Sequence, residues 1–199
     1  TRIVYISSTG VYGAGHGQVV DETAPIAPLS HAGQLRAAAE ARLQQECNAA
    51  QVPLVMLRAS GIYGGSRSLI GRARSGMMRI IGDGSTIVCR IHVDDLASAA
   101  IAAGRSTVTG AVNVSDDDHA SMRAVTEGVC AALGLATPAA TPAEAVTGEL
   151  AAMLLANRRI SNRRLHDDLG VTLEYPSWRT TLAAELAALG EGLSAKSAS

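Results

Sequence analysis

The first chemistry that the sequence suggests is phosphate binding by glycines near the start of the chain. The stretch RIVYISSTGVYGAGHG, residues 2–17, runs from β-branched residues into glycines at positions 10, 13, 15 and 17. A dinucleotide-binding loop needs the spacing G-x-G-x-x-G and opens directly onto a helix, whose free N–H groups hold the pyrophosphate. The spacing here is different, and the following residues, QVVDETAPIAP, contain two prolines and no helical apolar period. The stretch is therefore not predicted to bind a pyrophosphate.

Metal binding is the second chemistry to consider. His92, Asp94 and Asp95 have suitable side chains, but we expect them where a strand over 86–93 passes into a helix capped by Asp94. The carboxylates then face backbone N–H groups, and no metal site is predicted. The cysteines are odd in number and widely spaced, so we expect buried thiols in a reducing cytoplasm and no disulfide framework. They are Cys47, Cys89 and Cys130.

The elements that position these residues alternate between strand and helix. Residues 2–7 and 52–58 are predicted to be buried strands, and residues 30–51 between them a helix capped by Ser30. Strand, helix and strand in this order predict a right-handed parallel crossover. The helix has an apolar residue at every fourth position, which predicts a buried stripe. The stripe consists of Leu35, Ala39, Leu43 and Cys47.

The rest of the chain is predicted to add two strands and then a series of helices. The strands are expected at 86–93 and 111–115, and the helices at 67–80, 94–104, 121–133, 143–156, 161–169 and 177–190. The stretch TPAATPAEA, residues 137–145, is the best candidate for a linker because it is rich in proline and small residues.

Composition limits the classes of function. The chain has 199 residues, of which 47% are apolar and 18% charged, so a packed core is expected. A net charge of −1 gives no electrostatic basis for binding nucleic acid or an anionic membrane. The apolar runs are too short to cross a membrane, and no signal peptide is visible. We therefore expect a cytoplasmic protein with a small-molecule partner.

Short motifs give the chain a resemblance to a known family. They are Ser7-Ser8-x-x-Val11-Tyr12-Gly13, Asp21-Glu22-Thr23, Gly33 with Ala37-Ala38-Ala39-Glu40, Leu57-Arg58-Ala59-Ser60-Gly61-Ile62-Tyr63-Gly64, Ile91-His92-Val93-Asp94-Asp95-Leu96 and Asn113-Val114, followed by Ile160-Ser161-Asn162, Leu169-Gly170-Val171 and Tyr175-Pro176. In this order, over roughly residues 2–185, they resemble the extended short-chain dehydrogenases/reductases, the NAD-dependent epimerase/dehydratase family.

The resemblance implies an α/β fold: the second half of a Rossmann-like parallel sheet with a smaller, mostly helical C-terminal substrate domain. Residues 1–118 would form the latter part of the NAD(P)-binding domain with interleaved substrate-domain segments. Residues 119–190 would be mainly substrate-domain helices, and residues 191–199 a disordered tail.

The same resemblance implies the roles of individual residues. Ser8 would be catalytic, with its hydroxyl on the substrate oxygen, and the backbone of residues 59–62 would lie beside the nicotinamide of NAD or NADP. The residues expected to contact the cofactor are Ser7, Arg36, Ala59, Ser60 and Ile62. Thr9 and Gly10 stand where sugar-nucleotide dehydratases of the family carry an Asp-Glu pair, which argues against dehydration.

The first departure from the family pattern is at the N-terminus. Family members have a glycine-rich half before the Ser7-Ser8 strand, and the sequence here begins with that strand. The chain is therefore interpreted as the latter part of a longer protein or a truncated product, which would bind the cofactor only with the missing half. In the usual strand order 3-2-1-4-5-6, the strand 2–7 would pair with strand 1. Its open edge predicts self-association.

The second departure is in the acid/base pair. The family uses Tyr-x-x-x-Lys, a spacing that places both side chains on one helix face and lets the cation lower the phenol pKa from roughly 10. Aligning on Gly33 and Glu40 places Ala32 at the Tyr position and Arg36 at the Lys position. A shifted register with His31 and Leu35 is rejected because Leu35 begins the expected buried stripe. Tyr12, His31 and Tyr63 are weaker substitutes, each expected to be structural.

One basic cluster has two interpretations. In the family's small domain such arginines hold a substrate pyrophosphate through bidentate contacts, but we favour a solvated helix face. The cluster is Arg158, Arg159, Arg163 and Arg164.

The function predicted for the full-length protein is an atypical NAD(P)-dependent oxidoreductase or epimerase acting on a sugar-nucleotide or similar hydroxyl/carbonyl substrate. The group that moves the proton is not identified. The alternatives are a catalytically silent dinucleotide-binding sensor or scaffold, and an inactive fragment.

Overall fold

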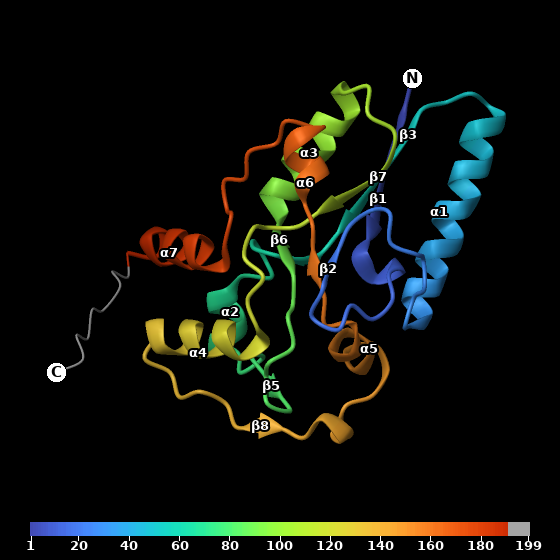
Figure 1. Cartoon of the computed structure of the whole chain (residues 1–199). Coiled ribbons are helices and arrows are strands. Elements are labelled where there is room, and N and C mark those ends of the chain that lie inside the picture. The colour runs from blue at the N-terminus through green and yellow to red at the C-terminus, as the bar shows by residue number, and fades with distance from the viewer. Residues whose placement is uncertain (191–199) are drawn as a thin grey trace.

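The centre of the molecule is a parallel sheet of three strands. The computed structural model describes residues 1–190, so the tail expected at 191–199 lies outside the described residues (Figure 1). The strands are ordered β1 (Ile3–Ser8), β3 (Leu54–Ala59) and β7 (Gly110–Val114). Ser8 lies opposite Ala59, and Ala59 lies opposite Val114. The carboxyl ends of all three strands therefore meet at one edge, where parallel sheets bind ligands.

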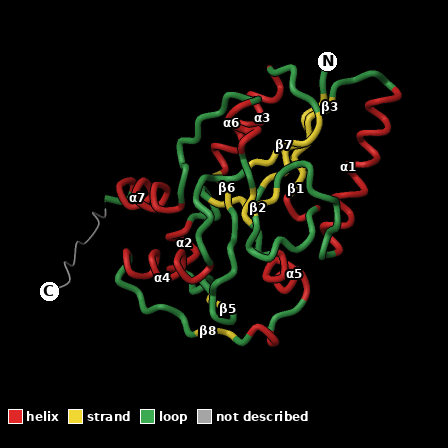
Figure 2. The backbone as a smooth tube through the Cα atoms, viewed as in Figure 1, coloured by secondary structure: helices red, strands yellow, loops and turns green. Residues whose placement is uncertain are grey.

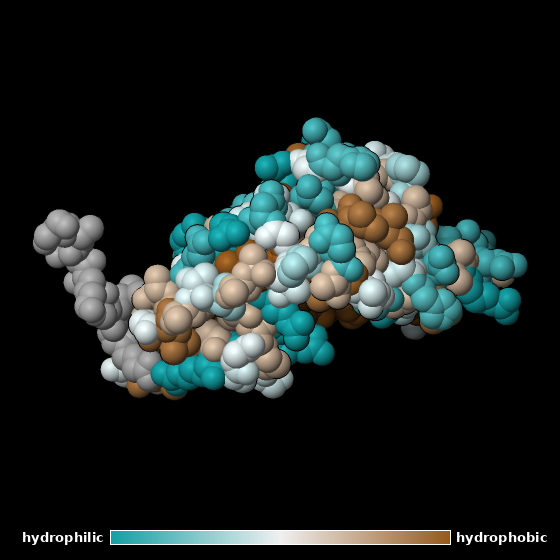
Figure 3. Space-filling model, turned by 90° about the horizontal axis from the view of Figure 1, so that it is seen from below, coloured by the Kyte–Doolittle hydropathy of each residue, from teal (hydrophilic) through white to brown (hydrophobic). Residues whose placement is uncertain are grey.

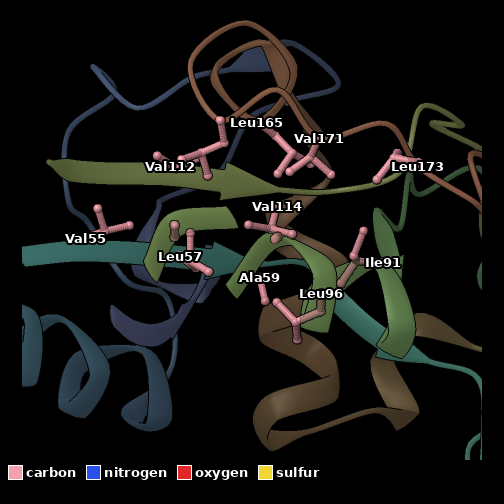
Figure 4. Packing of buried hydrophobic residues seen from close by; sticks show 13 residues of the cluster. Val55, Leu57, Ala59, Ile91, Leu96, Val112, Val114, Leu165, Val171 and Leu173 are labelled. Carbon is pink, nitrogen blue, oxygen red and sulfur yellow. The ribbon is translucent and has the colours of Figure 1, made fainter. Parts of the chain in front are cut away.

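Helices cover both faces of this sheet (Figure 1). Helix α1 (His31–Ala49) lies on one side, and α3 (Val93–Arg105) and α6 (Arg163–Asp167) lie on the other. Every residue of β3 is buried, Arg58 included, as expected for a strand that is covered on both faces. Alternate residues of β3 and β7 meet α3 and the α6 region in the main hydrophobic core (Figure 4). The core residues on these two strands are Val55, Leu57, Ala59, Val112 and Val114.

Helix α1 confirms the predicted cap and corrects the predicted stripe. The Ser30 Oγ accepts a hydrogen bond from the Gly33 N–H at 3.1 Å. Leu35, however, is 59% exposed. A four-residue repeat drifts by about 40° per step on a helix, so Leu35 lies about 120° around the axis from Cys47. The buried positions recur every seven residues, which nearly matches two helical turns, and they are Gly33, Glu40 and Cys47.

A second hydrophobic cluster joins three helices beyond the sheet. These are α2 (Leu69–Arg74), α4 (Met122–Ala132) and α7 (Trp178–Ala188). The helix expected over 121–133 corresponds to α4, whose Met122, Val125 and Val129 side chains are all buried. Gly128 allows the Trp178 ring to lie directly against α4, where any added Cβ would collide with the ring.

Three short parallel ladders join segments that are distant in the sequence (Figure 2). They pair β2 (Val19–Val20) with β9 (Arg159–Ile160), β4 (Gly61–Tyr63) with β6 (Arg90–His92), and β5 (Ile80–Ile81) with β8 (Ala140–Thr141). The strand expected at 86–93 is thus only β6, and the expected linker contains β8 and the single turn η2 (Ala143–Ala145). Beyond η2 lies α5 (Gly148–Ala156).

Two helix boundaries differ from the predictions. The helix expected over 67–80 ends at Arg74, because Gly76 adopts a left-handed φ of 66° shortly after it. Helix α3 is capped by His92, whose Nδ1 accepts from the Asp94 N–H at 3.3 Å, so Asp94 is not the cap. The buried Asp95 carboxylate instead accepts from the Glu174 and Tyr175 N–H groups at 2.8 and 3.0 Å.

Two features of the described residues bear on possible partners, the helix lengths and the edge of the sheet at β1. Among the helices within residues 1–190, none is both long and apolar enough to cross a membrane. Figure 3 shows one face on which hydrophobic patches are separated by hydrophilic residues. In the described chain β1 pairs only with β3, and Ile3 and Ile6 are 38% and 37% exposed.

Candidate active site

A cavity lies at the carboxyl ends of β1 and β3. We call it the Ser8 cavity, and its volume is about 200 Å³. Its first wall is Ser8 and the turn η1 (Thr9–Val11) that follows β1, and its second is Gly61, just beyond β3. Segments from far along the chain complete it with Cys89, Glu149 and Arg158. Parallel pairing of β1 with β3 brings the first two walls together.

Ser8 is oriented by a local hydrogen bond. Its Oγ accepts from the Gly10 N–H at 3.0 Å and thereby caps η1. A serine hydroxyl has one donor and two acceptor sites. The cap uses one acceptor site, so the Ser8 proton can be donated to a ligand oxygen in the cavity.

The five expected cofactor contacts occupy different surroundings. Ser7 is buried, and its Oγ donates to the Glu40 carboxylate at 2.5 Å. Arg36 is half-buried against β1, where its Nη1 donates to the Tyr5 hydroxyl at 3.1 Å and to the Ile6 carbonyl at 3.0 Å. Neither side chain lines the Ser8 cavity.

The other three expected contacts follow β3 towards the cavity. Ala59 and Ser60 are buried, and the Ser60 N–H donates to the Val114 carbonyl at 2.9 Å. The Ser60 Oγ is buried with no hydrogen-bond partner among the described residues. Ile62 is half-buried and lines a second cavity beside the first.

A buried polar network holds the ligand-bearing edge of the sheet, and the sequence analysis did not foresee it. Arg58 forms an ion pair with Glu40, with an Nη2–Oε2 distance of 2.7 Å. The Arg58 Nη1 donates to the Tyr12 hydroxyl at 2.9 Å, and that hydroxyl donates to the Asn113 Oδ1 at 2.7 Å. Burial raises the pKa of Tyr12 despite the nearby Arg58. Tyr12 is thus a structural residue, as expected, and an arginine inside an apolar strand was the signal for the pair.

The expected solvated arginine face is wrong for Arg158. The segment that carries it leads into β9 and not into a helix, and it passes behind the loop that follows β1. The buried Arg158 guanidinium donates to the carbonyls of Thr9 and Gly13, both at 2.7 Å. The Arg158 guanidinium therefore fixes the backbone that forms a wall of the Ser8 cavity. Burial lowers the pKa of Arg158.

A second cavity of about 270 Å³ continues from the first. It shares Gly61, Val88 and Met153 with the Ser8 cavity. Apolar side chains, among them Leu69 and Val125, line it together with four arginines, and we call it the arginine cavity. The arginines are Arg67, Arg72, Arg79 and Arg90.

Arg90 interacts electrostatically with a buried carboxyl group, that of Asp116. Its Nη1 donates to the Val88 carbonyl at 2.6 Å, and burial lowers the Arg90 pKa, partly opposed by Asp116. Asp116 is 1% exposed, and burial raises its pKa to about 8, an effect that Arg90 opposes. The arginine cavity thus combines cationic donors with an apolar wall, which suits a ligand that has both an anionic and an apolar part.

The residues considered for metal binding serve other purposes. His92 lies between the rings of Tyr63 and Tyr175, with centroid separations of 5.5 and 3.8 Å. Within residues 1–190 no group of three or more His, Cys, Asp or Glu is arranged to hold a metal ion. All three cysteines are unpaired, with Cys47 and Cys130 buried and Cys89 half-buried.

Comparison with known proteins decides the family. The sequence profile of the NAD dependent epimerase/dehydratase family matches residues 1–115, more than half of the chain. The chain belongs to this family. The resemblance stated from the motifs is therefore confirmed, and so is the Rossmann-like α/β fold.

Individual proteins share sequence and fold with this chain. A 3-diazoavenalumate denitrifying reductase from Streptomyces sp is 30% identical over 184 residues, covering 84% of this chain and 59% of that protein. A functionally unknown conserved protein from Silicibacter pomeroyi DSS is 33% identical and superposes with a TM-score of 0.83, covering 93% of this chain and 66% of that one. This chain therefore spans about three fifths of the length of the curated relative that it matches.

A family member with a known ligand has the same fold at lower identity. The UDP-glucuronic acid 4-epimerase from Bacillus cereus in complex with NAD gives a TM-score of 0.74 at 19% identity, covering 92% of this chain and 59% of that one. At this identity the likeness shows the fold alone.

Proposed function

We propose that this protein is an atypical NAD(P)-dependent oxidoreductase or epimerase that acts on a hydroxyl or carbonyl group of a sugar-nucleotide or similar small molecule. One observation carries the proposal. The Ser8 hydroxyl lines a cavity at the carboxyl edge of the sheet, and that cavity continues past Gly61 into an arginine-lined one. A reacting sugar in the first cavity would place its diphosphate and its planar aromatic base in the second.

The residues present fit the nicotinamide end of NAD or NADP. The buried Ser60 hydroxyl without a partner is a polar group that such a ligand would satisfy. The backbone of residues 59–62 would lie beside the nicotinamide ring. Arg36 would reach the ribose through the guanidinium nitrogen atoms that make no hydrogen bond to β1. Ser7 would contribute indirectly, through Glu40. When bound, the cofactor supplies hydride transfer.

The pyrophosphate end of the cofactor is not assigned to these residues. The glycines at 10–17 lead into a loop and the short strand β2, and not into a helix, as the sequence analysis predicts. This supports the proposal that cofactor binding requires the portion of the protein that relatives carry beyond the length matched here.

Ser8 and Arg158 have distinct tasks in the proposed reaction. Ser8 donates its hydroxyl proton as a hydrogen bond to the substrate oxygen and so stabilises charge that develops there. Arg158 fixes the carbonyls of Thr9 and Gly13, which keeps the turn that presents Ser8 in place. Thr9 and Gly10 provide no acid/base pair, which supports oxidoreduction or epimerisation over dehydration.

Calorimetric titration tests the substrate class. The probes are UDP-glucose, UDP-glucuronic acid and dTDP-glucose, and the variant is Arg79→Gln, which removes an exposed guanidinium of the arginine cavity. Loss of one charge-assisted contact should weaken binding of the best probe about tenfold. The matched control is Arg105→Gln in the last turn of α3, away from both cavities, and it should bind as the unmodified protein does. Equal weakening by both variants would count against a phosphate site.

A dinucleotide-binding sensor is the second candidate, favoured by one specific observation. Ala32 is the second residue of α1, and the alignment on Gly33 and Glu40 places it where the family carries its tyrosine, so this position offers no proton. Tight NAD(H) or NADP(H) binding with no turnover on any of the three probes would support the sensor. Three unpaired cysteines fit the reducing cytoplasm that we propose for either function.

A further inference from the structure

The proposed reaction needs a group that exchanges a proton with the substrate hydroxyl, and α1 does not supply one. Aligned with the family motif on the buried residues Gly33 and Glu40, the sequence places Ala32 at the position of the usual tyrosine. We propose that Glu149, in the first turn of α5, is this catalytic acid/base. The inference rests on the proposed function and names a residue from a different element for one of its steps.

Glu149 lies against the N-terminal turn of α1, beside the backbone of Ala32. Its Oε1 accepts a hydrogen bond from the Ala32 backbone N–H at 3.3 Å, although the two residues are 117 positions apart in the sequence. Figure 1 shows α5 near the N-terminal end of α1. Glu149 and Ser8 line the same cavity, so both can meet one substrate group.

The other titratable groups that line the Ser8 cavity form hydrogen bonds within the protein. The Tyr12 hydroxyl lies between Arg58 and Asn113. The Cys89 thiol donates to the Arg158 carbonyl at 3.3 Å, and burial raises its pKa. Arg158 donates to three backbone carbonyls. His31 does not line the cavity.

A carboxylate in this position can accept and return a proton. The backbone N–H of Ala32 holds Oε1 and leaves Oε2 for the substrate. In oxidation, the substrate O–H bond breaks and its proton goes to Glu149, while the electron pair of the neighbouring C–H bond leaves as hydride. The alcohol becomes a carbonyl and NAD⁺ becomes NADH, so atoms and electrons balance. In reduction Glu149 returns the proton to the carbonyl oxygen.

The test compares Glu149→Gln with a matched control, Glu144→Gln, an exposed glutamate in η2 outside both cavities. Full-length protein with NAD⁺ is titrated with UDP-glucose, UDP-glucuronic acid and dTDP-glucose. Calorimetry in buffers of different ionisation enthalpy measures affinity and the protons exchanged on binding, and NADH absorbance measures turnover. A ¹³C NMR titration of the Glu149 carboxyl gives a further readout that does not depend on turnover.

We expect Glu149→Gln to bind the best probe within about twofold of the unmodified protein, because glutamine keeps the size and the acceptor oxygen. Turnover should fall by about 100-fold or more, the usual contribution of general acid–base catalysis. Proton exchange on binding should be lost, and the probe should shift the Glu149 carboxyl signal. Glu149→Asp should restore part of the turnover with an altered pH profile, and Glu144→Gln should change none of these.

Turnover and proton exchange in Glu149→Gln equal to those of the unmodified protein would overturn this inference alone. A Glu149 carboxyl resonance that does not shift when a probe binds would also overturn this inference. Absence of binding and turnover in the unmodified protein as well would overturn the proposed function, and this inference with it.

Discussion

At the residue scale, the ion pairs of this protein are either exposed or buried, and removing one member of a pair has a different effect on stability in the two cases. Exposed pairs such as Arg42–Glu46, separated by 2.6 Å, remain in water. The Arg58–Glu40 pair is at most 7% exposed, and hydrogen bonds join it to Ser7 of β1 and to Tyr12, the residue after η1. Removing one member of a buried pair leaves an uncompensated charge, which costs far more than the loss of an exposed pair.

This difference predicts unequal effects of two similar substitutions. Glu40→Ala should lower the free energy of unfolding by about 3–5 kcal/mol, because Arg58 would stay buried without its partner. Glu46→Ala, in the same helix, should lower it by less than about 1 kcal/mol. Urea denaturation of the two variants measures both values. Similar losses in the two variants would show that the buried network does not stabilise the sheet edge.

Asp116 makes stability depend on pH in a defined direction. Burial raises its pKa in the folded protein to about 8, whereas the pKa of an aspartate in an unfolded chain is about 4. Between these values the unfolded chain binds fewer protons, so the free energy of unfolding falls as pH rises from about 4 to about 8. Asp116→Asn should therefore gain stability relative to the unmodified protein over this window. Denaturation at a series of pH values checks this, with Asp167→Asn as the exposed control. A constant difference between Asp116→Asn and the unmodified protein would refute it.

At the element scale, close contact between α4 and α7 depends on one position without a side chain. Gly128 faces the Trp178 ring, and an added methyl group would overlap it. Gly104 in α3 is also helical but has open space around it. The two glycines therefore separate the packing effect of a methyl group from its effect on helix propensity.

Alanine at these two glycines should have opposite effects. Gly128→Ala should destabilise by about 1–3 kcal/mol through overpacking. Gly104→Ala should stabilise by about 0.4–1 kcal/mol, because alanine restricts the unfolded chain and favours the helix. Thermal unfolding of both variants measures the signs. Stabilisation by Gly128→Ala would mean that Trp178 does not pack against α4 as described.

The main secondary-structure elements could be predicted from the sequence, but several contacts between them could not. β1, β3, β7 and α1 follow from local patterns of apolar residues and from the Ser30 cap, and the motifs identify the Ser8 end of the sheet. The stripe on α1 failed at Leu35 because a repeat of four drifts around a helix. The arginine within the apolar strand β3 indicates a buried partner but does not identify it, and the approach of Glu149 to Ala32 has no local signal. Folding brings these pairs together from 18 and 117 positions apart.

At the scale of the whole molecule, the ligand-bearing edge lies between two unequal parts. The three-stranded sheet and its helices provide Ser8 and the residues after β3, while the region around α2, α4 and α5 provides the arginine cavity and Glu149. The division into a domain over 1–118 and helices over 119–190 stays a proposal. A ligand bound across both cavities would connect the two parts.

Self-association through β1 also stays a prediction. In the described chain the outer edge of this strand is unpaired, and unpaired edges recruit other strands. The 199-residue chain should therefore show a sedimentation coefficient that rises with concentration in analytical ultracentrifugation. A single monomeric species at the highest concentration would contradict this.

The central claim is that the Ser8 hydroxyl acts on a substrate oxygen, and one comparison tests it most directly. NADH formation or consumption is followed for full-length protein with the three nucleotide sugars, in Ser8→Ala and in Ser68→Ala. Both serines accept a hydrogen bond from a glycine N–H at the start of a helical segment, at 3.0 and 2.9 Å, so both variants lose a cap. The account predicts turnover reduced by about 100-fold or more in Ser8→Ala only. Equal turnover in Ser8→Ala and Ser68→Ala would contradict it.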